Sequence, residues 1–275
     1  MKDVFLSKPY ILFIDSGIGG ISILNYLNSL HDSLNILYYA DSEHFPYGGK
    51  EEAVIGTYLL DIYNFLCKEY DIKLIVIACN TASVSALDFL RKRINIPIVG
   101  TVPAVKPASN MTLNKNIGII ATKTTVQSGY LSGLIRDFAA DSKVFIKEAS
   151  KLVEAIELQV SESELKEVID EELSFFNDKA IDTLVLGCTH YSYAEHDIYN
   201  YFNGIVKIVD SREGVSKRIL SLINDSFFDN DSKKILFLSS KKNIALYVQY
   251  NRKYTIFDDL YIKDVEWKKD SFFGV

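Results

Sequence analysis

Two cysteines occupy matching places in the sequence. Cys79 follows the apolar run 74–78, Cys188 follows the apolar run 184–187, and polar residues able to cap a helix come directly after each. A thiol at the carboxyl end of a buried parallel strand lies where α/β folds place their ligands, and a helix that begins there favours the thiolate. A single cysteine is often only a small buried apolar residue, but two in the same setting indicate reactive thiols. Such thiols can act as nucleophiles or as acid and base.

The third cysteine, Cys67, lies within an apolar helical pattern, so we expect a core position without a chemical role. Three cysteines do not make a disulfide framework. We therefore expect free thiols and a reducing, cytoplasmic compartment.

A glycine-rich segment, 13–20 (F-I-D-S-G-I-G-G), follows an apolar run and opens a helical pattern. It departs from the dinucleotide-binding fingerprint because Ser22 stands in the place of the last glycine. The backbone N–H groups of this turn and the Ser16 hydroxyl are better suited to hold a small carboxylate. Asp15 could contact an ammonium group, relay a proton or cap the helix.

Two further positions could meet a ligand. The turn 45–49 (F-P-Y-G-G) could present Tyr47, although a purely structural turn has the same composition. His190 follows Cys188 by two residues, within reach of a shared site. The histidines and cysteines are not spaced as a closed ligand set, so we expect no metal site.

Short runs of Ile, Val and Leu alternate with helical patterns along most of the chain, which is typical of parallel strands buried on both faces. We expect strands over 10–14, 35–40, 74–78, 98–100, 117–121, 184–187 and 205–209, and helices over 21–30, 51–70, 82–93 and 161–177. The last helix opens with a possible capping box at Ser161.

The repeated order of strand, cysteine and helix cap predicts an α/β fold of two similar parallel-sheet domains that face each other across a central cleft. Two prolines place the break within 101–107, and the tail from about 214 has the pattern helix, strand, helix. The first domain would hold 1–103 plus about 214–275 and carry Cys79. The second would hold 104–213 and carry Cys188.

The composition limits the classes of function. The 275 residues include 30 Lys and Arg against 36 Asp and Glu, a net charge of −6, which gives no electrostatic footprint for nucleic acid or an anionic membrane. The N-terminal residues lack a signal-peptide pattern, and no stretch reaches the roughly 18 apolar residues of a membrane span. We expect a small-molecule partner, no nucleic acid and no membrane.

Several of these motifs together resemble the glutamate racemase family. They are 15–20 (D-S-G-I-G-G), 46–48 (P-Y-G), 78–82 (A-C-N-T-A), 102–108 (V-P-A-V-K-P-A), 119–122 (I-I-A-T) and 186–191 (L-G-C-T-H-Y). The resemblance runs in order from about residue 10 to 220. Lys123 and Thr124 depart from it, and the tail after Asp225 carries little of it.

The resemblance implies a cofactor-independent racemisation of glutamate, in which Cys79 serves the D-substrate and Cys188 the L-substrate from opposite faces of Cα. Asp15 would lie near Cys79, and His190 and Glu154 near Cys188, where they set the thiol protonation states or help to hold the ammonium. The contacts to the substrate would come from Asp15, Ser16, Tyr47, Gly48, Asn80, Thr81, Thr189 and His190.

The same resemblance implies supply of D-glutamate for peptidoglycan, domain closure over glutamate and a homodimer. Three other interpretations stay open at this point. They are a racemase of another acidic amino acid such as aspartate, a thiol hydrolase that uses Cys188 with His190, and a protein that only binds small carboxylates.

Overall fold

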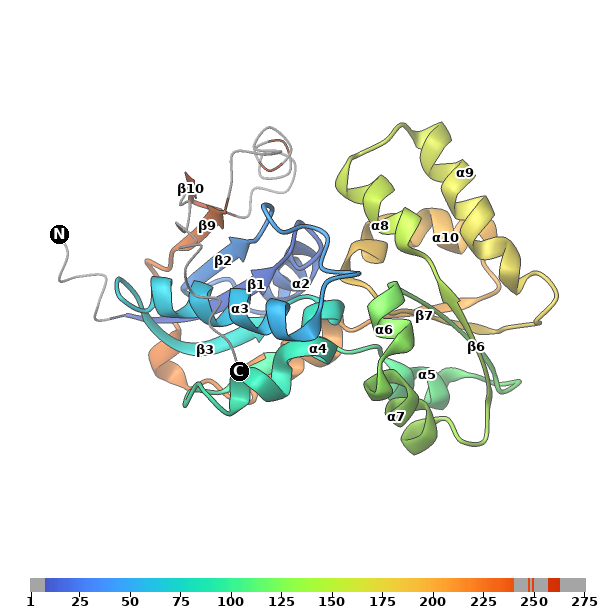
Figure 1. Ribbon diagram of the computed structural model, residues 1–275, viewed down its shortest axis with the longest axis horizontal. Coiled ribbons are helices and arrows are strands. Elements are labelled where there is room, and N and C mark those ends of the chain that lie inside the picture. Colours follow the sequence, from blue (N-terminus) through green and yellow to red (C-terminus); the bar gives the residue numbers. More distant parts are fainter. Residues whose placement is uncertain (1–7, 240–246, 248, 250–256, 263–275) are drawn as a thin grey trace.

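The computed structural model describes residues 8–239, 247, 249 and 257–262, and in this part of the chain two parallel β-sheets lie side by side (Figure 1). The strands of the first sheet are β1 (Pro9–Asp15), β2 (Ile36–Ala40), β3 (Asp71–Ile77), β4 (Ile98–Gly100), β9 (Lys234–Leu238) and β10 (Asp259–Ile262). Their order across the sheet is β10-β9-β2-β1-β3-β4, and the pairings are parallel.

Strand β1 runs through the middle of the first sheet and is buried on both sides. Tyr10, Leu12 and Ile14 point toward one core, whereas Ile11 and Phe13 point toward another. Helices α3 (Glu52–Leu66) and α4 (Asn80–Arg91) cover the first of these faces, and α2 (Ile21–Leu30) and α11 (Arg212–Leu220) cover the second. Because side chains of a strand alternate in direction, burial on both faces explains the unbroken apolar runs of the sequence.

The second sheet has the order β6-β5-β7-β8. Its strands are β5 (Asn116–Ala121), β6 (Lys143–Glu148), β7 (Thr183–Leu186) and β8 (Lys207–Val209). Its helices are α5 (Val105–Met111), α6 (Lys123–Gln127), α7 (Gly129–Phe138), α8 (Ser150–Glu157), α9 (Glu162–Leu173) and α10 (Glu195–Tyr201). Short 3-10 helices are η1 (Ser174–Phe176), η2 (Thr189–Ala194) and η3 (Asp225–Phe227).

The two halves share a hydrophobic core. Ile11 and Phe13 of the first sheet belong to the same cluster of buried side chains as Leu152 and Ile156 of α8. The tail returns to the first half, because β9 pairs with β2 and α11 packs against α2. The predicted α/β class with two parallel-sheet domains is therefore confirmed, while the exact residue division remains a prediction.

All seven expected strands are present, with ends that differ by up to three residues. Strand β6 was not anticipated, since its sequence K-V-F-I-K-E is charged at both ends and lies at the edge of its sheet. The capping box at Ser161 is present, with Glu164 as its second member. The helix expected after β9 lies largely outside the described residues.

The expected core position of Cys67 is wrong, because this thiol is exposed. Helix α3 ends at Leu66, which is fully buried, and the next residue turns toward solvent. None of the helices in the described residues combines the length and the apolar character that crossing a membrane requires.

Candidate active site

Cys79 and Cys188 line one cavity, although they come from different sheets. Cys79 follows β3 and is the N-cap residue of α4, and Cys188 follows β7 and is the N-cap residue of η2. The cavity has a volume of about 40 Å³ and draws its walls from both halves of the protein. The candidate residues among its walls are Ser16, Tyr47, Gly48, Cys79, Thr81, Glu154, Cys188 and His190.

Three further candidates are buried but do not line this cavity: Asp15, Asn80 and Thr189. Asp15, at the end of β1, has no solvent exposure and accepts the Gly17 N–H at 2.9 Å. Its other carboxylate oxygen accepts the Thr189 hydroxyl, from the other half, at 3.3 Å. Burial raises the pKa of Asp15 to about 6, against a smaller lowering by His190.

Cys79 is held in its protonated form. Burial raises the pKa of this thiol well above its ordinary value, and the negative charge of Asp15 raises it further. The Ala82 N–H at the start of α4 and the Ser16 hydroxyl act in the opposite direction, but their effect is smaller. The start of α4 therefore favours the thiolate of Cys79, as expected, but loss of hydration outweighs this effect and the net pKa is raised.

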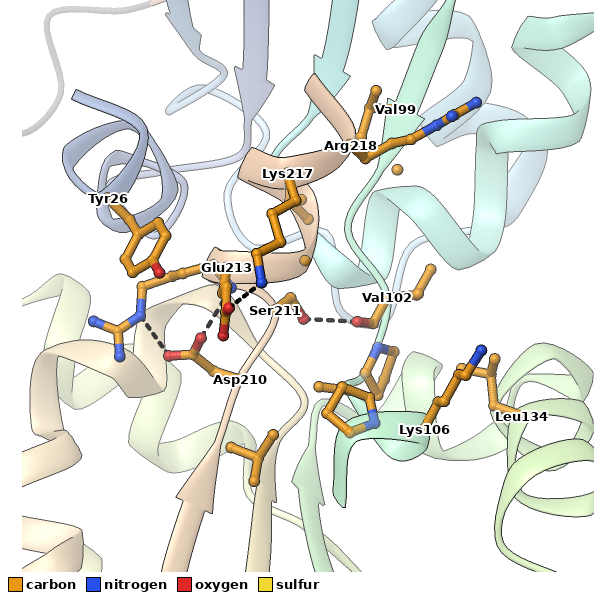
Figure 2. A pocket seen from close by; sticks show the side chains of 18 of the residues that line it. Tyr26, Val99, Val102, Lys106, Leu134, Asp210, Ser211, Glu213, Lys217 and Arg218 are labelled. Atoms are coloured by element: carbon orange, nitrogen blue, oxygen red, sulfur yellow. Dashed lines mark hydrogen bonds and ion pairs between the residues drawn. The ribbon is translucent and has the colours of Figure 1, made fainter. Parts of the chain in front are cut away.

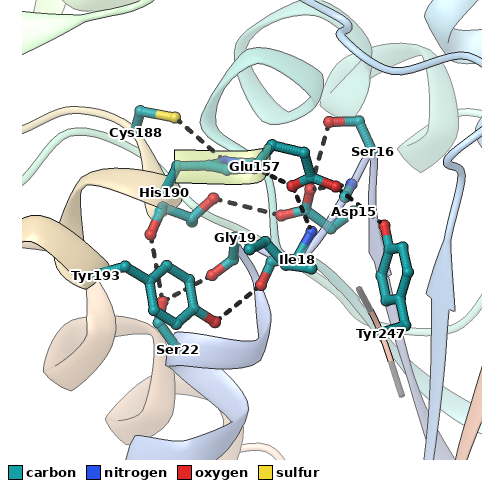
Figure 3. A network of polar contacts seen from close by, with 12 residues as sticks. Asp15, Ser16, Ile18, Gly19, Ser22, Glu157, Cys188, His190, Tyr193 and Tyr247 are labelled. Atoms are coloured by element: carbon teal, nitrogen blue, oxygen red, sulfur yellow. Dashed lines mark hydrogen bonds and ion pairs between the residues drawn. The ribbon is translucent and has the colours of Figure 1, made fainter. Parts of the chain in front are cut away.

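Cys188 has a different neighbour, the imidazole of His190. Nδ1 of His190 lies 3.8 Å from Sγ of Cys188, and Nε2 lies 2.8 Å from Oε2 of Glu157 (Figure 3). Burial alone would lower the pKa of His190, but the hydrogen bonds to Cys188 and Glu157 raise it well above its ordinary value. His190 therefore stands as an imidazolium beside the Cys188 sulfur. This side chain, rather than the short helix η2, supplies the positive charge there.

The carboxylate that contacts His190 is Glu157, which sequence reasoning missed. Glu154 is exposed at the wall of the cavity, whereas Glu157, one helical turn later, is 1% exposed. The available signal was the position of Glu157 on the apolar stripe of α8, beside Val153 and Ile156. A carboxylate on a buried stripe needs hydrogen-bond donors to replace its lost hydration. A buried ionisable side chain held in this way is a candidate for a functional role.

The glycine-rich turn holds a carboxylate, and this carboxylate belongs to the protein itself. The Ile18 N–H donates to Oε2 of Glu157 at 3.1 Å (Figure 3). A Cβ atom at Gly17 would lie 2.6 Å from the same oxygen, and one at Gly19 would collide with Thr189 and His190. Glycine at these two positions lets the halves approach closely at the site.

Some of the polar groups expected to bind a substrate are hydrogen-bonded within the protein, and one is not. The Tyr47 hydroxyl donates to Asp41 at 2.7 Å, and the hydroxyls of Thr81 and Thr122 lie 2.9 Å apart. The Thr81–Thr122 contact joins α4 to the end of β5, and Thr122 also lines the cavity. Nδ2 of Asn80 is buried and has no hydrogen-bond partner among the described residues, so it is a donor available to a ligand.

A larger cavity, of about 750 Å³, lies elsewhere at the junction of the halves (Figure 2). Its walls include Lys106 of α5 and Lys217 and Arg218 of α11, but neither Cys79 nor Cys188. The reactive side chains, rather than the size of a cavity, locate the site of chemistry. In the described part of the chain, no three His, Cys, Asp or Glu side chains gather as a possible metal site.

Residues 27–213 match the model of the Asp/Glu/Hydantoin racemase family. This match covers more than half of the sequence, so the chain belongs to that family, whose racemases are isomerases.

Glutamate racemases are among the relatives that it matches. That of Buchnera aphidicola subsp. Schizaphis graminum is 36% identical over 251 residues, which cover 89% of this chain and 96% of the relative. That of Pectobacterium carotovorum is 37% identical over 244 residues, which cover 87% of this chain and 82% of the relative. The crystal structure of Escherichia coli glutamate racemase with L-glutamate and the activator UDP-MurNAc-ala superimposes with a TM-score of 0.82 at 31% identity, covering 92% of this chain and 97% of that one.

Proposed function

We propose that this protein interconverts L- and D-glutamate without a cofactor, with Cys79 and Cys188 as its two acid–base groups. The observation that carries the proposal is that both thiols line one cavity in opposite settings. Burial and Asp15 keep Cys79 protonated, whereas the imidazolium of His190 lies beside the Cys188 sulfur. A racemase needs this arrangement, because a base must remove the Cα proton from one face while an acid donates to the other.

In the direction from L to D, the Cys188 thiolate takes the Cα proton, and the electron pair of the C–H bond stays on the substrate carbon. The Cys79 thiol then donates its proton to the opposite face, which yields D-glutamate, a Cys188 thiol and a Cys79 thiolate. The reverse reaction begins from that state. Asp15, with a pKa of about 6, is placed to exchange a proton on the Cys79 side near neutral pH.

Neutral donors suit the two carboxylates of glutamate, since they bind anions without repelling the ammonium. We propose Ser16, Thr81 and Asn80 for this purpose, with Tyr47, Gly48 and Thr189 close by. The cavity of about 40 Å³ is far smaller than the roughly 300 Å³ of a small ligand site, so the halves must separate for substrate to enter. Closure then excludes water around the carbanion.

NMR of L-glutamate incubated in D2O with the purified protein tests the proposal. We expect D-glutamate that carries deuterium at Cα, while the L-glutamate recovered early keeps its Cα proton. The reason is that one thiol removes the proton and the other thiol donates a deuteron that comes from solvent. Loss of racemisation in both Cys79→Ala and Cys188→Ala is expected as well. Turnover that survives in either variant, or absence of Cα exchange, would contradict the two-thiol mechanism.

The nearest alternative is a racemase of another acidic amino acid. Initial rates on L-aspartate and L-glutamate separate the two, since one methylene in a pocket discriminates by about 10–200-fold. Faster turnover of aspartate would favour the alternative. The role that we propose in the cell is supply of D-glutamate for peptidoglycan, by a homodimer whose mass light scattering can measure.

The larger cavity supports a second proposal, a site for an anionic effector. Among the described residues, Arg91, Lys106 and Arg218 line it without a carboxylate partner, and Tyr26 and Phe138 add aromatic surface. UDP-MurNAc-ala, the activator in the Escherichia coli complex, has a negatively charged diphosphate and a uracil ring, which suit these cations and aromatic rings. We expect this compound to raise the rate of the wild-type protein but not of Lys106→Ala/Arg218→Ala, and equal rates with and without it would contradict the proposal.

A further inference from the structure

The buried carboxylate of Glu157 receives donors from three separate parts of the chain. Oε2 accepts the Ile18 N–H at 3.1 Å and lies 2.8 Å from Nε2 of His190. Oε1 accepts the hydroxyl of Tyr247, in the C-terminal part of the chain, at 3.2 Å. In Figure 3, Tyr247 and His190 lie on opposite sides of Glu157. Each carboxylate oxygen thus has its own donors.

Tyr247 is placed as a dedicated donor rather than as a surface contact. Its side chain is fully buried, and its hydroxyl donates to Oε1, whereas Ile18 and His190 contact Oε2. Burial, followed by the charge of Glu157, raises the pKa of Tyr247 well above its ordinary value, so the hydroxyl keeps its proton throughout the neutral range. A buried negative charge depends on such donors, because it has lost its hydration.

We propose that Tyr247 is a positioning residue for catalysis, which keeps the negative charge on Glu157 and thereby keeps His190 as an imidazolium beside Cys188. Without the hydroxyl, the buried carboxylate of Glu157 loses its donor at Oε1 and supports the imidazolium of His190 less well. Less positive charge then lies beside Sγ of Cys188. The C-terminal part of the chain therefore acts on the Cys188 half of the reaction, although it pairs with the first sheet.

This inference rests on the proposed racemisation, and the equilibrium between enantiomers dictates how to test it. The equilibrium constant is one by symmetry, so any variant changes kcat/KM equally in both directions. Kinetic isotope effects, however, report which thiol step limits the rate. A slower Cys188 step raises the isotope effect with 2-deuterated L-glutamate, whose bond Cys188 breaks, and lowers it with 2-deuterated D-glutamate, whose bond Cys79 breaks.

The experiment compares Tyr247→Phe, which keeps the ring, with Tyr193→Phe. The Tyr193 hydroxyl donates at 3.0 Å to the carbonyl of Ile18, so this control removes a hydroxyl that is bonded to the glycine-rich turn rather than to Oε1 of Glu157. We expect Tyr247→Phe to lower kcat/KM roughly 10-fold, as for loss of a hydrogen bond to a charged group, and to shift the two isotope effects in opposite directions. Tyr193→Phe should leave both isotope effects at their wild-type values.

A double-mutant cycle completes the test. If Tyr247 acts through Glu157, then Tyr247→Phe should change kcat/KM less than about 2-fold in a Glu157→Gln background. Unchanged isotope effects in Tyr247→Phe, or full additivity in the cycle, would overturn the inference while leaving racemisation by the wild-type protein intact. Absence of glutamate racemisation by the wild-type protein would instead overturn the proposed function.

Discussion

Oε2 of Glu157 lies 2.8 Å from Nε2 of His190, and both residues are at most 2% exposed. We therefore expect Glu157 to matter more for catalysis than Glu154, which is exposed at the wall of the cavity. Because a buried imidazolium depends on its counter-charge, the two glutamates should differ sharply on substitution.

We expect Glu157→Gln to lower kcat/KM for L-glutamate by roughly 100-fold or more, since it removes the charge that keeps His190 protonated. The matched variant Glu154→Gln should lose much less activity. Steady-state rates from circular dichroism of the two enantiomers measure both. A larger loss in Glu154→Gln would restore the assignment expected from the sequence.

Only some features of the fold and the site could be predicted from the sequence. Most strands and the two thiols could be predicted, because parallel strands buried on both faces leave unbroken apolar runs and their carboxyl ends converge. The direction in which the pKa of Cys79 shifts could not be predicted, since it depends on how completely the folded protein excludes water from the thiol. Glu157 was missed because its partners, Ile18 and Tyr247, are far away in the chain.

The glycine-rich turn gives a steric prediction. Gly19→Ala should lower kcat/KM roughly 10-fold or more, because the new methyl group collides with His190 and Thr189 and displaces them from the site. Gly129→Ala is the control, since no atom lies within 4 Å of a Cβ there and alanine favours the helix. Melting temperatures measured alongside the rates separate a local displacement from unfolding. Full activity in Gly19→Ala would show that the halves do not need this close approach.

Asp15 gives a prediction about pH and stability. Its pKa is about 6 in the folded protein against 3.8 for an ordinary aspartate, so between these values the native state binds more protons than the unfolded chain. The free energy of unfolding therefore decreases as the pH rises through this window, and the loss levels off above pH 6 at roughly 3 kcal/mol or less.

Asp15→Asn should consequently raise the free energy of unfolding near neutral pH, and this gain should shrink as the pH falls toward 4. Denaturant titrations at several pH values measure it. Asp88→Asn, on the exposed side of α4, controls for the loss of one negative charge. A gain of the same size at every pH would mean that ionisation of Asp15 is not its cause.

The small volume of the cavity predicts a change of shape. We expect small-angle scattering to give a smaller radius of gyration with saturating L-glutamate than without it, because the free protein must open to admit substrate and then close. L-leucine at the same concentration is the control. One radius of gyration in all three samples would contradict domain closure.

The pairing of β9 with β2 has a consequence for how the protein is made. Strands β5, β6, β7 and β8 pair only with one another among the described strands, so a ribosome-bound chain can complete the second sheet early. The first sheet must wait for β9, which leaves the tunnel nearly two hundred residues after the strand beside it. Tyr247 emerges later still, so the nascent chain acquires its full set of donors to Glu157 only after β9 has left the tunnel.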